Sequence, residues 1–511
     1  MLPWPGQRGE AATERRALVR RHLLILLLVT AVTRGLLFVS YPMGGGDDDQ
    51  AYARYQIDRI LGGDLLVGNL RYHTGYPLAI APVAAAASLF GRFDERALLL
   101  AQTALAALIP FLIYDSLRLL GRPLREALIA ALVAALDPFG LQWAHFALPN
   151  WLIALCLVAA LWCVARGLAS GRALAWTAAA GLLCGVAVLA RVNLAPVIAA
   201  LGLAFFGLRA LPWRRRFAMF AALGAVSGGV LALYTAAVHY PSTGTWSLSC
   251  YTGTNLLVSV YGKGFPLTAD NGPATQRLLD LLTLKPPREI EFTSAIYPRW
   301  SEPGSWATPD EYAAFIGQPY GQRAAQLDTV WPGNLFYYLG PCATDDLLLA
   351  VHNEAVARDP LRWLASVPLD VFNMLTQRQL PGLFWPWYLP HHDALAFSGP
   401  GTLGFYRAKG DFYSGQVVWR PGVWLFSHLF DIWNLFKWLA PLAVIWALLR
   451  ARCWYYAVSA LLLLAFLALL SVFGNPAPRL YAPVYPLTSI VIGGMLAALL
   501  ARLRPARQPE I

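Results

Sequence analysis

The feature that most constrains this chain is a series of long apolar runs that recurs from residue 22 to residue 501. Runs of about 18–25 apolar residues are long enough to cross a bilayer as helices. Charged residues make up 14% of the chain, whereas soluble proteins carry about 25%. Much of the surface therefore meets lipid, which excludes a soluble enzyme and a disordered chain. The expected fold class is an all-α polytopic membrane protein.

About ten transmembrane helices are expected, together with juxtamembrane helices and an α-rich extracytoplasmic region. The candidate spans are 22–41, 97–118, 126–143, 150–166, 173–190, 193–208, 217–238, 431–449, 453–473 and 480–501. The first run is followed by Tyr41-Pro42 and has no small-residue cleavage site, so we interpret it as an uncleaved span.

Arginine placement decides how the apolar stretch Tyr76–Phe90 is interpreted. Cytoplasmic loops of membrane proteins are enriched in Lys and Arg. If Tyr76–Phe90 were a span, clusters such as Arg214–Arg216 would lie outside the cell. As a membrane-surface or re-entrant helix, it leaves them inside, with both termini cytoplasmic. We therefore expect a multi-pass protein of a membrane such as the bacterial inner membrane.

The net charge of +11 resides mainly in these short clusters between apolar runs, so no nucleic-acid partner is expected. The chain divides into a cytoplasmic tail, a first membrane module with an outer loop at 42–96, an extracytoplasmic region and a second membrane module. These are residues 1–21, 22–238, 239–430 and 431–511.

Two of the six cysteines, Cys250 and Cys342, fall in the extracytoplasmic region, where the environment is oxidising. We predict that they form a disulfide. The other four lie in or beside apolar spans and are expected to be packing residues. No pair has CxxC spacing, and no Cys/His cluster resembles a zinc site.

An acidic triplet, Asp47-Asp48-Asp49, follows the first span directly after Gly44-Gly45-Gly46. Adjacent carboxylates repel one another, and desolvation near a membrane adds to that cost. Such a group fits a cation site, a basic ligand or a catalytic base, and a solvated acidic turn is the simpler alternative.

Outward-facing arginines are the second unusual feature. Arg191 and Arg479 lie where predicted spans begin or end on the outer face of the membrane, although most basic residues lie on the cytoplasmic side. Arg34 lies within the first span. A cation near membrane depth needs an anionic partner, and a guanidinium matches a phosphate well. Snorkelling to the interface is the alternative for Arg191, and Asp47–Asp49 are candidate partners for Arg34.

In this order, the motifs resemble those of the GT-C superfamily of integral-membrane glycosyltransferases, especially the branch of protein O-mannosyltransferases and aminoarabinose transferases. Arg34 and Asp48-Asp49-Gln50-Ala51-Tyr52 are similar to the family's first-helix arginine and its Asp-Glu-x-x-Tyr motif. His73–Pro77 is similar to the start of the family's juxtamembrane helix. Gly181–Asn193 is similar to the segment whose cation faces the donor phosphate, and Arg479–Pro483 to the motif before the last helix.

The resemblance implies transfer of a sugar, hexosyl or pentosyl, from a polyprenyl-phosphate donor to a glycan, lipid or protein acceptor on the outer face, with inversion. It implies Asp48 as general base and Asp49 as the residue that orients the acceptor or a cation. It implies phosphate binding by Arg191, Arg479 and Arg34. The expected substrate-binding residues are Tyr52, His73, Tyr76, Asn150 and Tyr481.

The chain departs from the family at Asn150, where an acidic residue is often found. No cofactor is therefore assigned, and a divalent cation is left open. Membrane lipid is the remaining expected partner. The alternative function is a polytopic transporter or lipid flippase without transferase activity.

Overall fold

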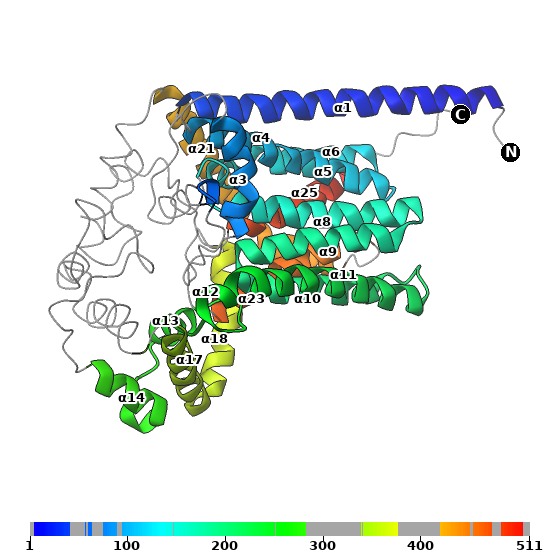
Figure 1. Ribbon diagram of the computed structural model, residues 1–511. Coiled ribbons are helices and arrows are strands. Elements are labelled where there is room, and N and C mark those ends of the chain that lie inside the picture. Colours follow the sequence, from blue (N-terminus) through cyan, green and yellow to red (C-terminus); the bar gives the residue numbers. More distant parts are fainter. Residues whose placement is uncertain are drawn as a thin grey trace.

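The computed structural model describes residues 5–40, 57, 60–63, 75–88, 95–146, 148–250, 252–282, 339, 341–376, 420–449, 453–472 and 482–503. Regular structure within these ranges is helical throughout. Most of the long helices run side by side as one bundle (Figure 1). Helix α1 begins and helix α25 ends toward the right-hand side of that view, and the helices of the region predicted to be extracytoplasmic lie beyond the other end of the bundle.

The bundle is formed mainly by helices that each contain a long apolar stretch. They are α1 (Pro5–Ser40), α4 (Glu95–Ala106), α5 (Leu108–Leu119), α6 (Leu124–Leu136), α8 (Asn150–Ser170), α9 (Ala173–Ala190), α10 (Ala195–Ala204), α11 (Trp213–Tyr234), α22 (Ala440–Leu449), α23 (Trp454–Val472) and α25 (Tyr485–Arg502). One continuous hydrophobic core joins them. The predicted all-α membrane fold is confirmed.

Seven helices in the described ranges are long and apolar enough to cross a membrane. The number is eight if α21 (Arg420–Lys437) and α22, which are bent by 48° relative to each other, form one broken span. Helix α6 and the segment Val192–Gly207 are shorter. The predicted count of ten spans is therefore not established.

The stretch predicted to lie at the membrane surface forms helix α3 (Gly75–Ser88). It runs across the ends of the bundle helices rather than along them (Figure 1). Its first residue, Gly75, is pressed against the backbone of Leu189 and Ala190, and a Cβ atom would not fit there. Glycine therefore lets the start of α3 contact the end of α9 directly.

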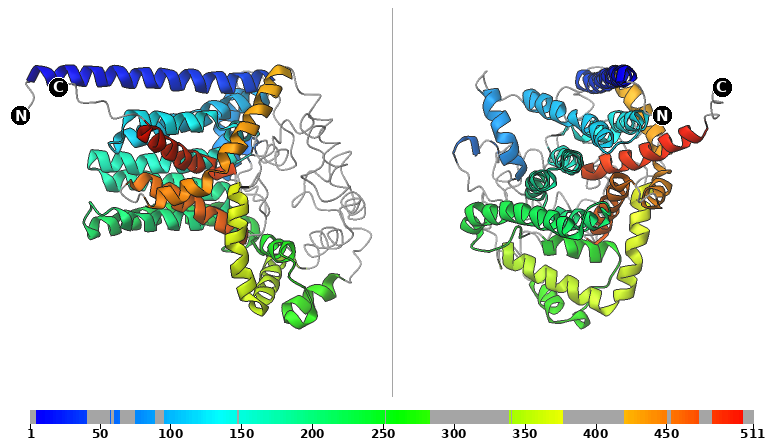
Figure 2. Two further views of the ribbon diagram at one scale, coloured as in Figure 1. Left: turned by 180° about the vertical axis from the view of Figure 1, so that it is seen from behind. Right: turned by 90° about the vertical axis from the view of Figure 1, so that its right-hand side faces the viewer.

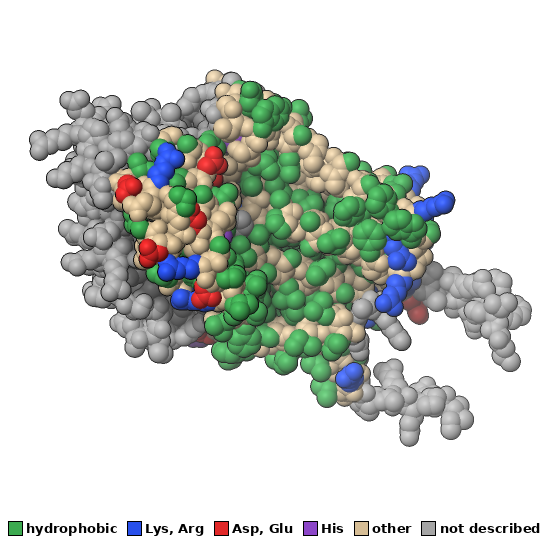
Figure 3. Space-filling model, turned by 90° about the horizontal axis from the view of Figure 1, so that it is seen from below, with side chains coloured by type: hydrophobic (Ala, Val, Ile, Leu, Met, Phe, Trp, Pro, Cys, Tyr) green, Lys and Arg blue, Asp and Glu red, His purple; other side chains and the backbone are tan. Residues whose placement is uncertain are grey.

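Basic side chains gather at the bundle end that lies away from the extracytoplasmic helices. Figure 3 shows Lys and Arg beyond the far edge of an apolar belt, whereas the opposite end carries both acidic and basic side chains. This distribution follows the positive-inside pattern. The orientation of the termini remains a prediction.

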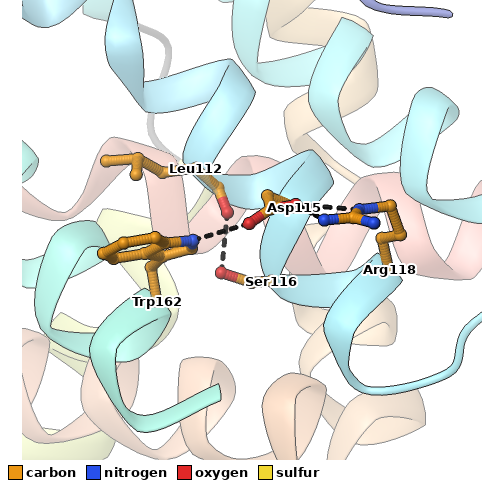
Figure 4. A network of polar contacts seen from close by, with 5 residues as sticks. All are labelled: Leu112, Asp115, Ser116, Arg118 and Trp162. Carbon is orange, nitrogen blue, oxygen red and sulfur yellow. Dashed lines mark hydrogen bonds and ion pairs between the residues drawn. The ribbon is translucent and has the colours of Figure 1, made fainter. Parts of the chain in front are cut away.

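Charges toward this basic end satisfy one another locally. Asp115 accepts hydrogen bonds from Arg118 at 2.5 and 2.8 Å through Oδ1, and from Trp162 Nε1 at 2.9 Å through Oδ2 (Figure 4). Glu126 pairs with Arg122 through both carboxylate oxygens, each at 2.8 Å. These ion pairs lie close in sequence and fix the turns around α5 and α6.

A small helical unit has its own apolar core, and we call it the extracytoplasmic unit after its predicted location. It contains α13 (Thr252–Gly262), α14 (Pro273–Leu282) and α17 (Pro341–Arg358). Two carboxylates of α17 cap the starts of the other two helices. Asp345 accepts N–H bonds from Thr252 and Thr254, and Glu354 accepts them from Ala274 and Thr275. Burial raises the pKa of Asp345 to about 6, although these bonds favour its charged form.

A disulfide joins Cys250 to Cys342, the pair that the sequence predicted, with Cα atoms 4.6 Å apart. It links the chain that leaves the membrane module after α12 (Tyr240–Thr243) to the start of α17. Because Cys250 lies just before α13, the bridge holds the starts of α13 and α17 together within this unit. Closing a loop of 92 residues stabilises the folded state by restricting the unfolded chain.

Alkylation of the denatured protein without reductant should label Cys156, Cys163, Cys184 and Cys453 and leave Cys250 and Cys342 unlabelled, because only the first four are free thiols. Mass spectrometry after alkylation checks this, and prior reduction of a second sample is the control. Labelling of Cys250 or Cys342 before reduction would show that the pair is not bonded.

Candidate active site

Four residues of the predicted site lie in the described part of the chain: Arg34, Tyr76, Asn150 and Arg191. All four lie at the bundle end that adjoins the extracytoplasmic unit. The others lie outside the described residues, so their roles stay predictions: Asp48, Asp49, Tyr52, His73, Arg479 and Tyr481.

Arg34 is a buried cation inside the first span. It lies six residues before the end of α1, about 9 Å below that end at 1.5 Å per residue. Its side chain is 7% exposed, and Nη2 donates to the carbonyl oxygen of Ala106 at 3.5 Å. Its Nε and Nη1 have no hydrogen-bond partner among the described residues. A guanidinium in this setting needs an anion to offset its desolvation.

Asp137 is a buried carboxylate that joins three helices. It caps α7 (Pro138–Trp143) by accepting the N–H groups of Phe139 at 3.0 Å and Gly140 at 3.4 Å. Ser489 of α25 donates to its other oxygen at 3.0 Å. Lys437 of α21, which is 2% exposed, attracts it electrostatically. The carboxylate thus compensates a lysine that lies deep in apolar surroundings.

Tyr485 connects these two charged positions. Its ring lies against Gly140, where a Cβ atom would collide with it, and it interacts electrostatically with both Arg34 and Asp137. We call Arg34, Asp137, Lys437, Tyr485 and Ser489 the outer polar cluster. It holds two cations and one carboxylate, so its formal charge is positive.

Tyr76 belongs to a second buried network, centred on Gln102 of α4. Gln102 Nε2 donates to the carbonyl oxygens of Ala144 at 2.9 Å and Phe146 at 2.8 Å, and Tyr76 donates its hydroxyl to Gln102 Oε1 at 3.2 Å. The network holds the turn after α7 and places the buried His145 edge-on to Phe38 of α1, with 5.8 Å between centroids. The structure thus gives Tyr76 a packing role, and its substrate-binding role stays a prediction.

Asn150 and Arg191 lie close to Tyr76 in the fold. Asn150 is buried at the start of α8, and the next residue, Trp151, contacts the Tyr76 ring edge-on at 6.4 Å. Arg191 is half-buried at the end of α9, beside the Leu189–Ala190 backbone on which Gly75 packs. Helices α3, α8 and α9 therefore bring three predicted residues to one region.

A metal site does not emerge from the described residues. Among them, no group of three or more His, Cys, Asp or Glu side chains could hold a metal ion. Asp137 is already engaged by Ser489, two backbone N–H groups and Lys437. The triplet Asp47–Asp49 lies outside the described residues, and a divalent cation bound there stays a prediction.

Sequence reasoning did not assign Lys437, Gln102, Tyr485 or Ser489. Lys437 is one of four lysines in the chain and follows an apolar stretch, and Gln102 interrupts the run 97–118. A polar residue inside an apolar run is a signal of an internal polar contact, and it could have identified both. Tyr485 and Ser489 carry no comparable signal.

The sequence matches one known family over part of its length. Residues 75–241, which include Tyr76, Asn150 and Arg191, match the family described as dolichyl-phosphate-mannose-protein mannosyltransferase. This match shows that residues 75–241 are similar to a family of mannosyltransferases, and the helical membrane bundle agrees with the predicted resemblance to the GT-C superfamily. The resemblance to that superfamily is confirmed. No curated protein matches the chain significantly.

Two solved structures illustrate the weak similarity that a comparison of structures finds. The oligosaccharyltransferase AglB of Archaeoglobus fulgidus, in complex with an inhibitory peptide and a dolichol-phosphate, is 16% identical, with a TM-score of 0.44 over 95% of this chain and 52% of its own. ArnT of Cupriavidus metallidurans bound to undecaprenyl phosphate is 13% identical, with a TM-score of 0.36 over 96% of this chain and 82% of its own. The chain thus spans about half the length of the archaeal enzyme.

Proposed function

We propose that this protein transfers a sugar from a polyprenyl-phosphate donor to an acceptor on the outer face of the membrane. The match over residues 75–241 supports the transferase class. The choice of a lipid-linked donor rests on the buried cations at the outer end of the bundle. In this proposal the membrane is the bacterial inner membrane and both termini are cytoplasmic.

The proposed reaction is a single in-line displacement at the anomeric carbon. Asp48 removes the proton from the acceptor hydroxyl, the acceptor oxygen bonds to the anomeric carbon, and the bond from that carbon to the phosphate oxygen breaks. The configuration inverts, and the polyprenyl phosphate leaves with the bonding electrons. Asp49 orients the acceptor.

The observation that carries the proposal is that the Arg34 side chain is buried and that two of its nitrogens have no described hydrogen-bond partner. A guanidinium that is 7% exposed, with Nε and Nη1 lacking partners in the described chain, provides two donors for an oxyanion at membrane depth. In this proposal Arg34 binds the donor phosphate, together with Arg191 and Arg479.

Arg191→Ala should raise the KM for the polyprenyl-phosphate sugar by about 10–100-fold, because a hydrogen bond to a charged group contributes about 1.5–3 kcal/mol. Initial rates at varied donor concentration in proteoliposomes measure the change. Arg172→Ala is the matched control, since that exposed arginine lies at the other end of α9. An unchanged KM in Arg191→Ala would remove this residue from the phosphate site.

A transporter or flippase is the competing function. Such proteins place ionisable groups near the bilayer midplane. In the described residues, the outer polar cluster lies toward one end of the bundle instead, next to the extracytoplasmic unit. This placement favours chemistry on the outer face over a path through the bundle.

A further inference from the structure

Helix α18 (Pro360–Thr376) has an exposed face made of large apolar side chains. Leu361, Leu364, Leu369 and Phe372 are between 51% and 76% exposed. At 3.6 residues per turn their positions fall within one sector of the helix. Trp363 and Met374 lie in the opposite sector and are buried. The helix is therefore amphipathic, and the described residues leave its apolar side uncovered.

The inward side of α18 is fixed to a membrane span by a polar network. Lys263, just after α13, pairs with Asp370 at 3.0 Å and donates to Ser366 at 2.7 Å and to Ser471 at 3.1 Å. Ser471 also donates to Asp370 at 2.7 Å. Because Ser471 is the penultimate residue of α23, the network holds α18 at the level where that span ends.

The direction of α18 differs from that of the spans. It runs across their ends in Figure 1, and it lies at the rim of the bundle in the right-hand view of Figure 2. Helix α22, against which it packs, also points apolar side chains outward, among them Leu442 and Ile445. The exposed face of α18 therefore adjoins lipid-facing surface.

We propose that α18 lies flat in the outer boundary of the bilayer, with Leu361, Leu364, Leu369 and Phe372 inserted among the lipids. An amphipathic helix parallel to the membrane plane buries its apolar face ~5–10 Å into the boundary between headgroups and acyl chains. Lys263 then joins this helix to the α13–α14–α17 unit through Asp370 and Ser366. The unit is held at a fixed height above the membrane, whichever reaction the protein performs.

Spin labels test this placement in the full-length protein reconstituted in phosphatidylcholine nanodiscs. Cys156, Cys163, Cys184 and Cys453 are first replaced by alanine, and single cysteines are then introduced at Leu364 and Phe372. Gln276→Cys, on the exposed polar side of α14, is the matched control. Accessibility to oxygen and to a water-soluble nickel chelate gives the depth of each label.

Labels at positions 364 and 372 should be reached by oxygen and protected from the nickel chelate, at a depth of ~5–10 Å, while the label at 276 should be open to the chelate. Chelate accessibility at 364 and 372 equal to that at 276 would show that the face lies in water. Protection from both reagents would show that protein covers the face. Either result would overturn the proposal.

Discussion

Asp48→Asn should lower the rate of sugar transfer by about 10²–10⁴-fold, the usual contribution of a general base. The carboxamide keeps the size of the side chain but cannot take a proton from the acceptor hydroxyl. Expression and thermal unfolding should stay unchanged, because the substitution removes one charge from an acidic triplet whose members repel one another. Initial rates of sugar transfer, measured with saturating donor in proteoliposomes, compare Asp48→Asn with the parent protein.

Asp47→Asn is the matched control for this variant, since it changes the neighbouring carboxylate in the same way. It should keep most of the activity. Near-full activity in Asp48→Asn would remove Asp48 from the role of base. Equal losses in both variants would indicate a general requirement for acidic charge in the loop.

Lys437→Met should destabilise the protein by about 3–5 kcal/mol, because it leaves Asp137 as an uncompensated charge in an apolar setting. Both side chains are almost fully buried, and each is the other's electrostatic partner. The double variant Asp137→Asn/Lys437→Met should recover most of this loss, because the amide oxygen still accepts the bond from Phe139 while the amide NH2 donates to the hydroxyl of Ser489. Unfolding by SDS in mixed micelles measures the free energy of unfolding of the parent, the single variant and the double variant.

Leu435→Met, at an exposed position of the same helix, is the control and should leave the stability within about 0.5 kcal/mol of the parent. A double variant as unstable as Lys437→Met would contradict the pairing. The destabilisation would then come from lost packing around the lysine stem rather than from the stranded carboxylate.

Apolar run length and arginine placement predicted the membrane bundle and the position of α3. Both signals are local: a run either reaches the length of a span or it does not, and the arginines mark the cytoplasmic loops. The sequence also predicted an α-rich extracytoplasmic region, and α14, α17 and α18 lie in it. Their limits are set by tertiary contacts, such as the capping of α14 by Glu354, 80 residues after Ala274.

The outer polar cluster could not be predicted in the same way. Asp137 is paired with Ser489, 352 residues later in the chain, and Arg34 with the carbonyl of Ala106, 72 residues later. Nothing local to either residue specifies such partners, because they depend on which helices become neighbours. The sequence could place Arg34 inside a span, but only the fold shows that two of its nitrogens lack described partners.

Transfer from a panel of polyprenyl-phosphate sugars is the measurement that tests the central claim most directly. Purified protein in liposomes is supplied with each donor and with extracts containing candidate acceptors, and release of polyprenyl phosphate is followed beside incorporation of labelled sugar. A transferase releases one polyprenyl phosphate for each sugar incorporated, and Asp48→Asn suppresses both. Movement of donor between leaflets without release of polyprenyl phosphate, unchanged in Asp48→Asn, would contradict the account and indicate a flippase.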